Sequence, residues 1–114
     1  MLAKANRVTR AADYRRIVRT GRRRGGPLVL AYARSGDAAA PLRMGVIVAK
    51  NVGNAVVRNR VRRRIKAIGW QLAHEVQGID VVVRALPPAA DASFADLERE
   101  VDVAVRALAG KEAA

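Results

Sequence analysis

Cysteine is absent from this sequence of 114 residues. The absence excludes a disulfide scaffold, a thiolate metal site and a cysteine nucleophile. Long hydrophobic runs are missing too: residues 27–33 form one of the longest apolar stretches, and they fall far short of the roughly 20 residues that a membrane-spanning helix needs. The first residues contain no apolar segment of the kind that signal peptides carry, so we expect a cytoplasmic protein without a membrane partner.

Aromatic residues make up only 4% of the chain, and its 10 acidic residues are outnumbered by 22 Lys and Arg, for a net charge of +12. Hydrophobic residues still account for 51%, which is enough for the packed core of one domain. The charge is uneven: residues 1–79 hold 18 basic and 3 acidic residues (+15), whereas residues 80–114 hold 4 and 7 (−3). Such a concentration of positive charge destabilises a compact state unless a polyanion neutralises it, and nucleic acid is the usual partner.

Hydrophobic periodicity and turn residues predict a single α+β domain over residues 1–114, with residues 1–8 and 110–114 as disordered ends. The fold class is an α/β sandwich in the order α-β-β-β-α-β-α with a mostly antiparallel four-stranded sheet. We expect a first helix that is capped by Thr9 and runs to about 19. A basic turn with a short strand over 22–27 follows, and then strands over 28–33 and 44–49. A long helix begins at the turn over 50–54, runs to about 76 and is closed by Gly78; a strand over 80–86 and a final helix come after it. Ser93 caps that helix, Asp96 follows as in a capping box, Gly110 closes it, and its apolar stripe is Phe94, Leu97, Val101, Val105 and Leu108.

Residues 58–66 include six Arg and Lys in nine positions. At 100° per residue the apolar side chains of this helix gather in one arc, and the cations cover most of the remaining surface. A solvated helix face mixes charges of both signs, yet no acid occurs between Asp37 and Glu75. Each pair of like charges four residues apart costs roughly 0.2–0.5 kcal/mol, and the helix dipole disfavours cations near its N-terminus. We therefore predict that phosphates bind this helix. The expected core arc is Val57, Val61, Ile65, Ile68 and Leu72.

Several single residues allow two interpretations. Tyr14 and Tyr32 are either ordinary residues at the edge of the core or surfaces on which bases stack. Trp70 either stacks on a base or packs against a neighbouring loop, and packing is the commoner case. His74 lacks a placed partner for acid–base chemistry, and the acids of the last helix are typical of a solvated face, so the sequence predicts no catalytic residue and no metal ligand.

Residues 50–63 resemble the signature of the protein subunit of bacterial ribonuclease P: a Lys, a Gly, an Ala and then Arg58-Asn59-Arg60 followed by an apolar residue and two cations. The likeness extends over nearly the whole chain, through residues 13–14, Tyr32, 43–46, 80–83 and 93–94. The resemblance implies a protein that binds a large catalytic RNA, in a particle that removes the 5′ leader from precursor tRNA. It implies that the RNA and its Mg²⁺ perform the hydrolysis, that the protein itself binds no cofactor and needs no obligate protein partner, and that the strand-helix-strand crossover is left-handed.

The resemblance also implies roles for residues. A cleft between the first helix and the sheet is expected to hold the leader. Val18 stands where the family often has a second Phe. Leu86 stands at a position that is usually basic, and Arg84 is expected to compensate for it. Contacts with the catalytic RNA are expected from Arg58, Asn59, Arg60, Arg62, Arg63 and Lys66. The leader cleft is expected to contain Tyr14, Val18, Tyr32, Lys50 and Arg84.

Three other functions share some of these features. A structural ribosomal protein has similar charge but co-sediments with ribosomal subunits. A nuclease that acts alone needs a His pair or clustered carboxylates within the basic region, where the sequence has neither. A DNA-binding helix-turn-helix protein needs a second short helix that the pattern does not predict.

Overall fold

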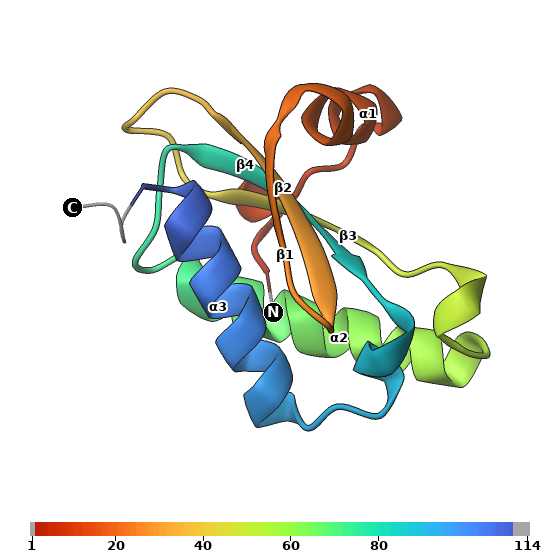
Figure 1. Ribbon diagram of the computed structural model, residues 1–114. Helices are drawn as coiled ribbons and strands as arrows, with labels where there is room; N and C mark the ends of the chain where they lie inside the picture. The colour runs from red at the N-terminus through yellow and green to blue at the C-terminus, as the bar shows by residue number, and fades with distance from the viewer. Residues whose placement is uncertain (1, 111–114) are drawn as a thin grey trace.

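The computed structural model describes residues 2–110. Within them the chain forms three α-helices, four strands and three short 3₁₀ helices (η), in the order η1-α1-β1-β2-β3-η2-α2-β4-η3-α3 (Figure 1). This order confirms the predicted α+β class. The bounds are η1 Lys4–Asn6, α1 Ala11–Thr20, β1 Arg22–Gly25, β2 Val29–Ser35, β3 Arg43–Ile47, η2 Lys50–Val52, α2 Ala55–Leu72, β4 Ile79–Ala85, η3 Pro87–Ala90 and α3 Phe94–Leu108.

The four strands form one sheet in the order β1-β2-β4-β3. Antiparallel pairs join β1 to β2 and β2 to β4, whereas β3 and β4 are parallel, so the sheet is mostly antiparallel as predicted. Parallel neighbours need a long connection rather than a hairpin, and α2 provides it between β3 and β4. The left-handedness of this crossover stays a prediction from the family resemblance.

Alternation along the strands gives the sheet two different faces. Val29, Ala31 and Ala33 of β2 belong to the larger core, which α2 and α3 cover. Tyr32 of the same strand lies on the opposite face, in a smaller cluster with Val8, Ile17 and Val82 beneath α1. Figure 1 shows α1 on one side of the sheet and α2 and α3 on the other.

Residues 2–8 depart from the disordered end that we expected. Leu2 and Val8 are each only 4% exposed, and Leu2 belongs to the larger core. The Asn6 side chain donates a hydrogen bond to the Leu42 carbonyl at 2.8 Å, and Arg7 forms a β-bridge with Met44. Burial of apolar side chains therefore outweighs the positive charge of this segment. Met1 and residues 111–114, which the expectation also covered, lie outside the described residues.

Two helix boundaries differ from the predictions. Arg10, not Thr9, is the N-cap of α1, and no side chain caps that helix. The long helix α2 ends at Leu72 rather than near Val76, because the chain tightens into i→i+3 turns in which His74 and Glu75 donate to carbonyls three residues back. Gly78, expected to close the helix, instead precedes β4 with a φ of 81°.

The predicted cap of α3 is confirmed, because the Ser93 side chain accepts a hydrogen bond from the Asp96 backbone N–H at 3.1 Å. The other half of the expected capping box is not formed, since the Asp96 carboxylate accepts a hydrogen bond from Arg99 instead. The predicted apolar stripe is buried except for Phe94, which is 40% exposed at the first turn. At the other end Gly110 follows the helix with a φ of 78°, as a residue that closes a helix commonly does.

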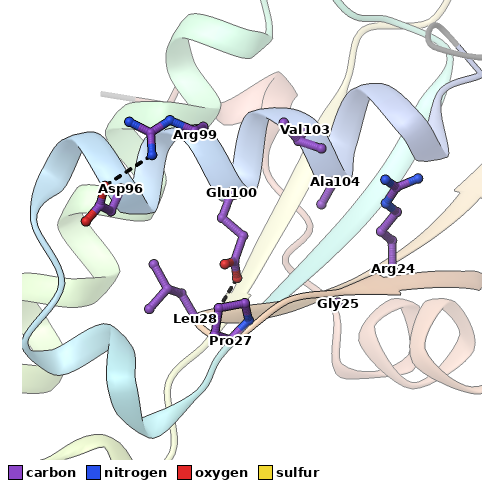
Figure 2. Close-up of a pocket in the computed structure, with 9 residues that line it drawn as sticks. All are labelled: Arg24, Gly25, Pro27, Leu28, Asp96, Arg99, Glu100, Val103 and Ala104. Carbon is purple, nitrogen blue, oxygen red and sulfur yellow. Dashed lines mark hydrogen bonds and ion pairs between the residues drawn. The ribbon is translucent and has the colours of Figure 1, made fainter.

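Glu100 is the exception among the acids that we expected on a solvated face. Its carboxylate accepts the backbone N–H groups of Leu28 and Val29, at 2.8 and 2.6 Å, and so fastens α3 to the turn between β1 and β2. Figure 2 shows Glu100 reaching from α3 toward Pro27 and Leu28. The three residues line a hollow of about 480 Å³. Gly26 makes this approach possible, since a β-carbon there would lie 2.7 Å from the carboxyl carbon of Glu100.

Candidate nucleic-acid interface

Helix α2 presents its cations because its apolar residues lock it onto the sheet. Val61, Ile65, Ile68 and Leu72 are buried and Val57 is partly buried, so the predicted arc faces the core. Asn54 caps the helix by accepting a hydrogen bond from the Val57 N–H at 3.0 Å. The opposite side of the helix bears a shallow depression of about 380 Å³, lined by Val56, Asn59, Arg62, Arg63 and Lys66.

We call Asn59, Arg62, Arg63 and Lys66 the cationic stripe. Arg62 donates a hydrogen bond to the Asn59 side-chain oxygen at 2.7 Å. Among residues 2–110, no carboxylate lies within ion-pair distance of Arg62, Arg63 or Lys66, and the ion pairs that the structure shows involve other residues. Those pairs join Arg43 to Asp13 and Asp80, Arg99 to Asp96, and Arg106 to Glu75 and Asp102. The stripe is thus a surface of uncompensated positive charge.

Two other arginines of α2 point toward η3 and the chain that follows it. Arg60 donates to the Ala90 carbonyl at 3.0 Å, and Arg64 donates to the Ala92 carbonyl at 3.1 Å. The structure therefore separates Arg60 from the cationic stripe and gives its guanidinium a partner within the protein. Arg58 differs again: it is half-buried, and its Nε is buried with no hydrogen-bond partner in the described part of the chain.

The opposite face of the sheet carries a groove of about 380 Å³, between α1 and the strands. Its lining combines one aromatic ring and two apolar side chains with three arginines. Of the residues predicted for a leader cleft, Tyr14, Val18 and Arg84 line it together. We call it the α1 groove, and its lining residues are Tyr14, Arg15, Val18, Arg19, Ile47 and Arg84.

Tyr32 and Lys50 lie differently from the other residues of the predicted cleft. Tyr32 is only 7% exposed, and the Arg84 guanidinium carbon is 5.8 Å from the centre of its ring, within the range of a cation–π contact. Arg84 thus covers the ring on which a base was expected to stack. Lys50 is exposed at the start of η2 and does not line the groove.

Arg15, Arg19 and Ile47 line the groove without having been predicted there. Helical spacing held a signal for the two arginines, because Arg15 and Arg19 are four residues apart and Arg15 is three residues before Val18, which places them on adjoining positions of one side of α1. The strand register supplies a further cation: Arg23 of β1 is paired with Tyr32 of β2, and directly paired residues project to the same face of a sheet. No sequence pattern could give this register.

Arg43 lies between strand β4 and the N-terminal turn of α1. Its Nε and one terminal nitrogen bind the two carboxylate oxygens of Asp80 at 2.9 and 2.6 Å, and its other terminal nitrogen lies 3.9 Å from Asp13 of α1. The hydrogen bond to Asp80 is the main reason that the pKa of Arg43 is raised above its ordinary value, and burial opposes the shift. A guanidinium stays charged at any physiological pH, so Arg43 keeps its positive charge beside Asp13 of α1 and Asp80 of β4.

Residues 2–110 show neither a metal centre nor a membrane-spanning helix. Nowhere in this part of the chain do three His, Asp or Glu side chains gather closely enough to hold a metal ion. None of its helices combines the length and hydropathy that crossing a membrane requires. What remains is a protein with two basic surfaces, the cationic stripe and the α1 groove, on opposite sides of one sheet.

Comparison with known proteins gives a consistent result. The family model described as Ribonuclease P matches residues 2–109. The chain is 47% identical over 106 residues to the ribonuclease P protein component of Clavibacter michiganensis, covering 92% of this chain and 94% of that protein. It is also 47% identical over 112 residues to the corresponding protein of Beutenbergia cavernae, covering 95% and 92%. Among solved structures, the RNase P protein of Staphylococcus aureus superposes with a TM-score of 0.80 at 26% identity, over 91% of this chain and 95% of that one.

Proposed function

This chain belongs to the ribonuclease P protein family, and from that membership we propose that it binds the catalytic RNA through α2 and the 5′ leader of precursor tRNA in the α1 groove. As a ribonuclease P protein component, it is part of an endoribonuclease particle that processes tRNA. The single observation that carries the proposal is the cationic stripe: three cations on one helix face without a carboxylate partner in residues 2–110.

In this proposal the phosphates of the catalytic RNA neutralise the positive charge of α2. Arginine predominates over lysine on the helix, and arginine suits bidentate contacts with phosphate. Five or six neutralised phosphates make log K fall with log salt at a slope of roughly −4 to −5. Arg62, Arg63, Lys66 and Asn59 are the residues best placed for direct contact, Arg58 contacts RNA from the flank, and Arg60 contributes while it holds η3.

A single strand suits the α1 groove. Tyr14 offers an aromatic ring, Val18 and Ile47 offer apolar surface, and Arg15, Arg19 and Arg84 offer charge for the backbone. Stacking and phosphate contacts tolerate any base sequence, which the leader requires because it differs from one tRNA to another. Lys50 extends the positive surface beyond the groove, and the Tyr32 ring packs against the Arg84 guanidinium.

The chemistry of hydrolysis belongs to the RNA and its Mg²⁺ in this proposal, so we assign no catalytic residue and no metal ligand to the chain. The protein holds substrate and catalytic RNA together and broadens the range of substrates. It works in the cytoplasm, without an obligate protein partner.

Reconstitution tests the proposed function. The purified chain is added to the catalytic RNA of the same organism at a Mg²⁺ concentration too low for the RNA alone, and cleavage of precursor tRNA is followed. We expect the chain to restore cleavage at the mature 5′ end. Absence of stimulation over the whole protein titration would contradict the proposal, and cleavage by the chain without RNA would contradict the assignment of catalysis to RNA.

A further inference from the structure

Trp70 is the only tryptophan of the chain, and 42% of it is exposed. Tryptophan is usually well buried, and the sequence pattern favoured packing against a neighbouring loop. The structure leaves it on the outer face of α2. Trp70 lies seven residues after Arg63 and four after Lys66, so the indole continues the cationic stripe by one turn.

His74 holds the indole in a defined orientation. The two ring centroids are 4.7 Å apart and the ring planes are 73° apart, which is an edge-to-face contact. The Nδ1 atom of His74 lies 2.8 Å from the main-chain oxygen of Trp70, so the imidazole is tied to the C-terminal end of the helix that carries the indole. Within residues 2–110 the indole N–H has no hydrogen-bond partner. An aromatic ring that contacts His74 therefore stands beside the cationic stripe with part of its surface open.

The place of Trp70 in the fold decides which nucleic acid it faces. The α1 groove and α2 lie on opposite faces of the sheet, since their residues belong to separate core clusters. A strand held in the α1 groove is thus on the other side of the protein. The nucleic acid nearest to Trp70 is the one that the cationic stripe binds.

We propose that Trp70, oriented by His74, is a stacking site for an unpaired base of the catalytic RNA, whose flanking phosphates are neutralised by Arg63 and Lys66. The proposal rests on the proposed function and adds a recognition element to it. An aromatic ring beside a positively charged surface is the usual arrangement for holding an unpaired base, and it distinguishes an unpaired base from a paired duplex, whose bases are not available for stacking.

The single tryptophan makes the test direct, because its fluorescence reports on Trp70 alone. The catalytic RNA is titrated into the wild-type chain, and the dissociation constant and its salt dependence are measured for wild type, W70A, W70F and R63Q. Binding is expected to quench the fluorescence. W70A is expected to weaken binding by roughly 5- to 150-fold, the effect of losing one stacked base, with the salt slope unchanged. W70F is expected to recover most of the affinity.

The matched control is V103A on α3, where a 45% exposed apolar side chain lies away from the cationic stripe. V103A is expected to bind the RNA as wild type does, and R63Q is expected to weaken binding and reduce the salt slope by about 1. The proposal would be overturned if the tryptophan fluorescence of the wild-type chain does not change when the RNA binds and W70A binds the RNA with wild-type affinity. Self-association of the free chain that W70A abolishes without a loss of RNA affinity would also overturn it, because Trp70 would then be part of a protein interface. If the wild-type chain binds no catalytic RNA, the proposed function itself has failed, which is a different result.

Discussion

The ring of Tyr14 lies directly against Gly45. A β-carbon on Gly45 would come within 2.5 Å of Cζ of that ring, and the Tyr14 hydroxyl accepts a hydrogen bond from the Val46 N–H at 3.3 Å. Helix α1 and strand β3 therefore approach as closely as they do only because Gly45 has no side chain. Tyr14 also lines the α1 groove, so the groove depends on this contact.

Gly45→Ala tests that dependence. The added methyl group displaces the ring, and we expect the free energy of unfolding to fall by about 1–3 kcal/mol, as overpacking in a core commonly costs. The affinity for leader-bearing precursor tRNA is expected to fall with it. Gly36→Ala is the control, because nothing lies within 4 Å of a β-carbon there. Unchanged stability and leader binding of the Gly45 variant, measured by denaturant unfolding and filter binding, would contradict the contact.

Glu100→Ala tests the link between α3 and the β1–β2 turn. The substitution leaves two backbone N–H groups without their acceptor, and we expect the free energy of unfolding to fall by about 1.5–3 kcal/mol. Glu98→Ala removes an exposed carboxylate of the same helix and is expected to change stability little. Equal effects of the two substitutions in urea unfolding would show that Glu100 is an ordinary solvated acid.

Arg60 and Arg63 lie three residues apart on one helix, and substitution of each is expected to have a different effect: on stability for Arg60 and on RNA binding for Arg63. Arg60→Gln removes the bond to the Ala90 carbonyl and is expected to lower stability by about 1 kcal/mol. Arg63→Gln is expected to leave stability unchanged and to reduce the salt slope of RNA binding by about 1. Thermal unfolding and binding at several salt concentrations measure both quantities. A larger loss of RNA affinity from the Arg60 substitution than from the Arg63 substitution would reverse the assignment.

Arg84→Gln separates leader binding from binding of the tRNA body. Because Arg84 lines the α1 groove and covers Tyr32, we expect the affinity for precursor tRNA to fall roughly three- to tenfold, as the loss of one phosphate contact does. The affinity for mature tRNA, which lacks the leader, is expected to stay the same. Arg99→Gln is the control, since Arg99 is paired with Asp96 on α3. Equal losses for both tRNAs would place Arg84 outside the leader path.

The sequence predicted the order of elements, the cap of α3 and the buried arc of α2, because each depends on periodicity or on neighbouring residues. It could not show that Leu2 and Val8 are buried, since their partners are distant in the chain. It could not separate Arg60 from Arg63 either, because both are cations on one helix and only the position of η3 distinguishes them. The cover that Arg84 places over Tyr32 arises from the register of β2 with β4, which no local pattern specifies.

The most direct test of the central idea, that phosphates of the catalytic RNA complete the charge of α2, is the affinity of that RNA for a chain in which Arg58, Arg62 and Arg63 are all replaced by Gln. We expect the triple variant to fold, as circular dichroism would show, and to bind the catalytic RNA at least about 30-fold more weakly, with a shallower salt dependence. A folded triple variant that assembles with the RNA at wild-type affinity would contradict the account.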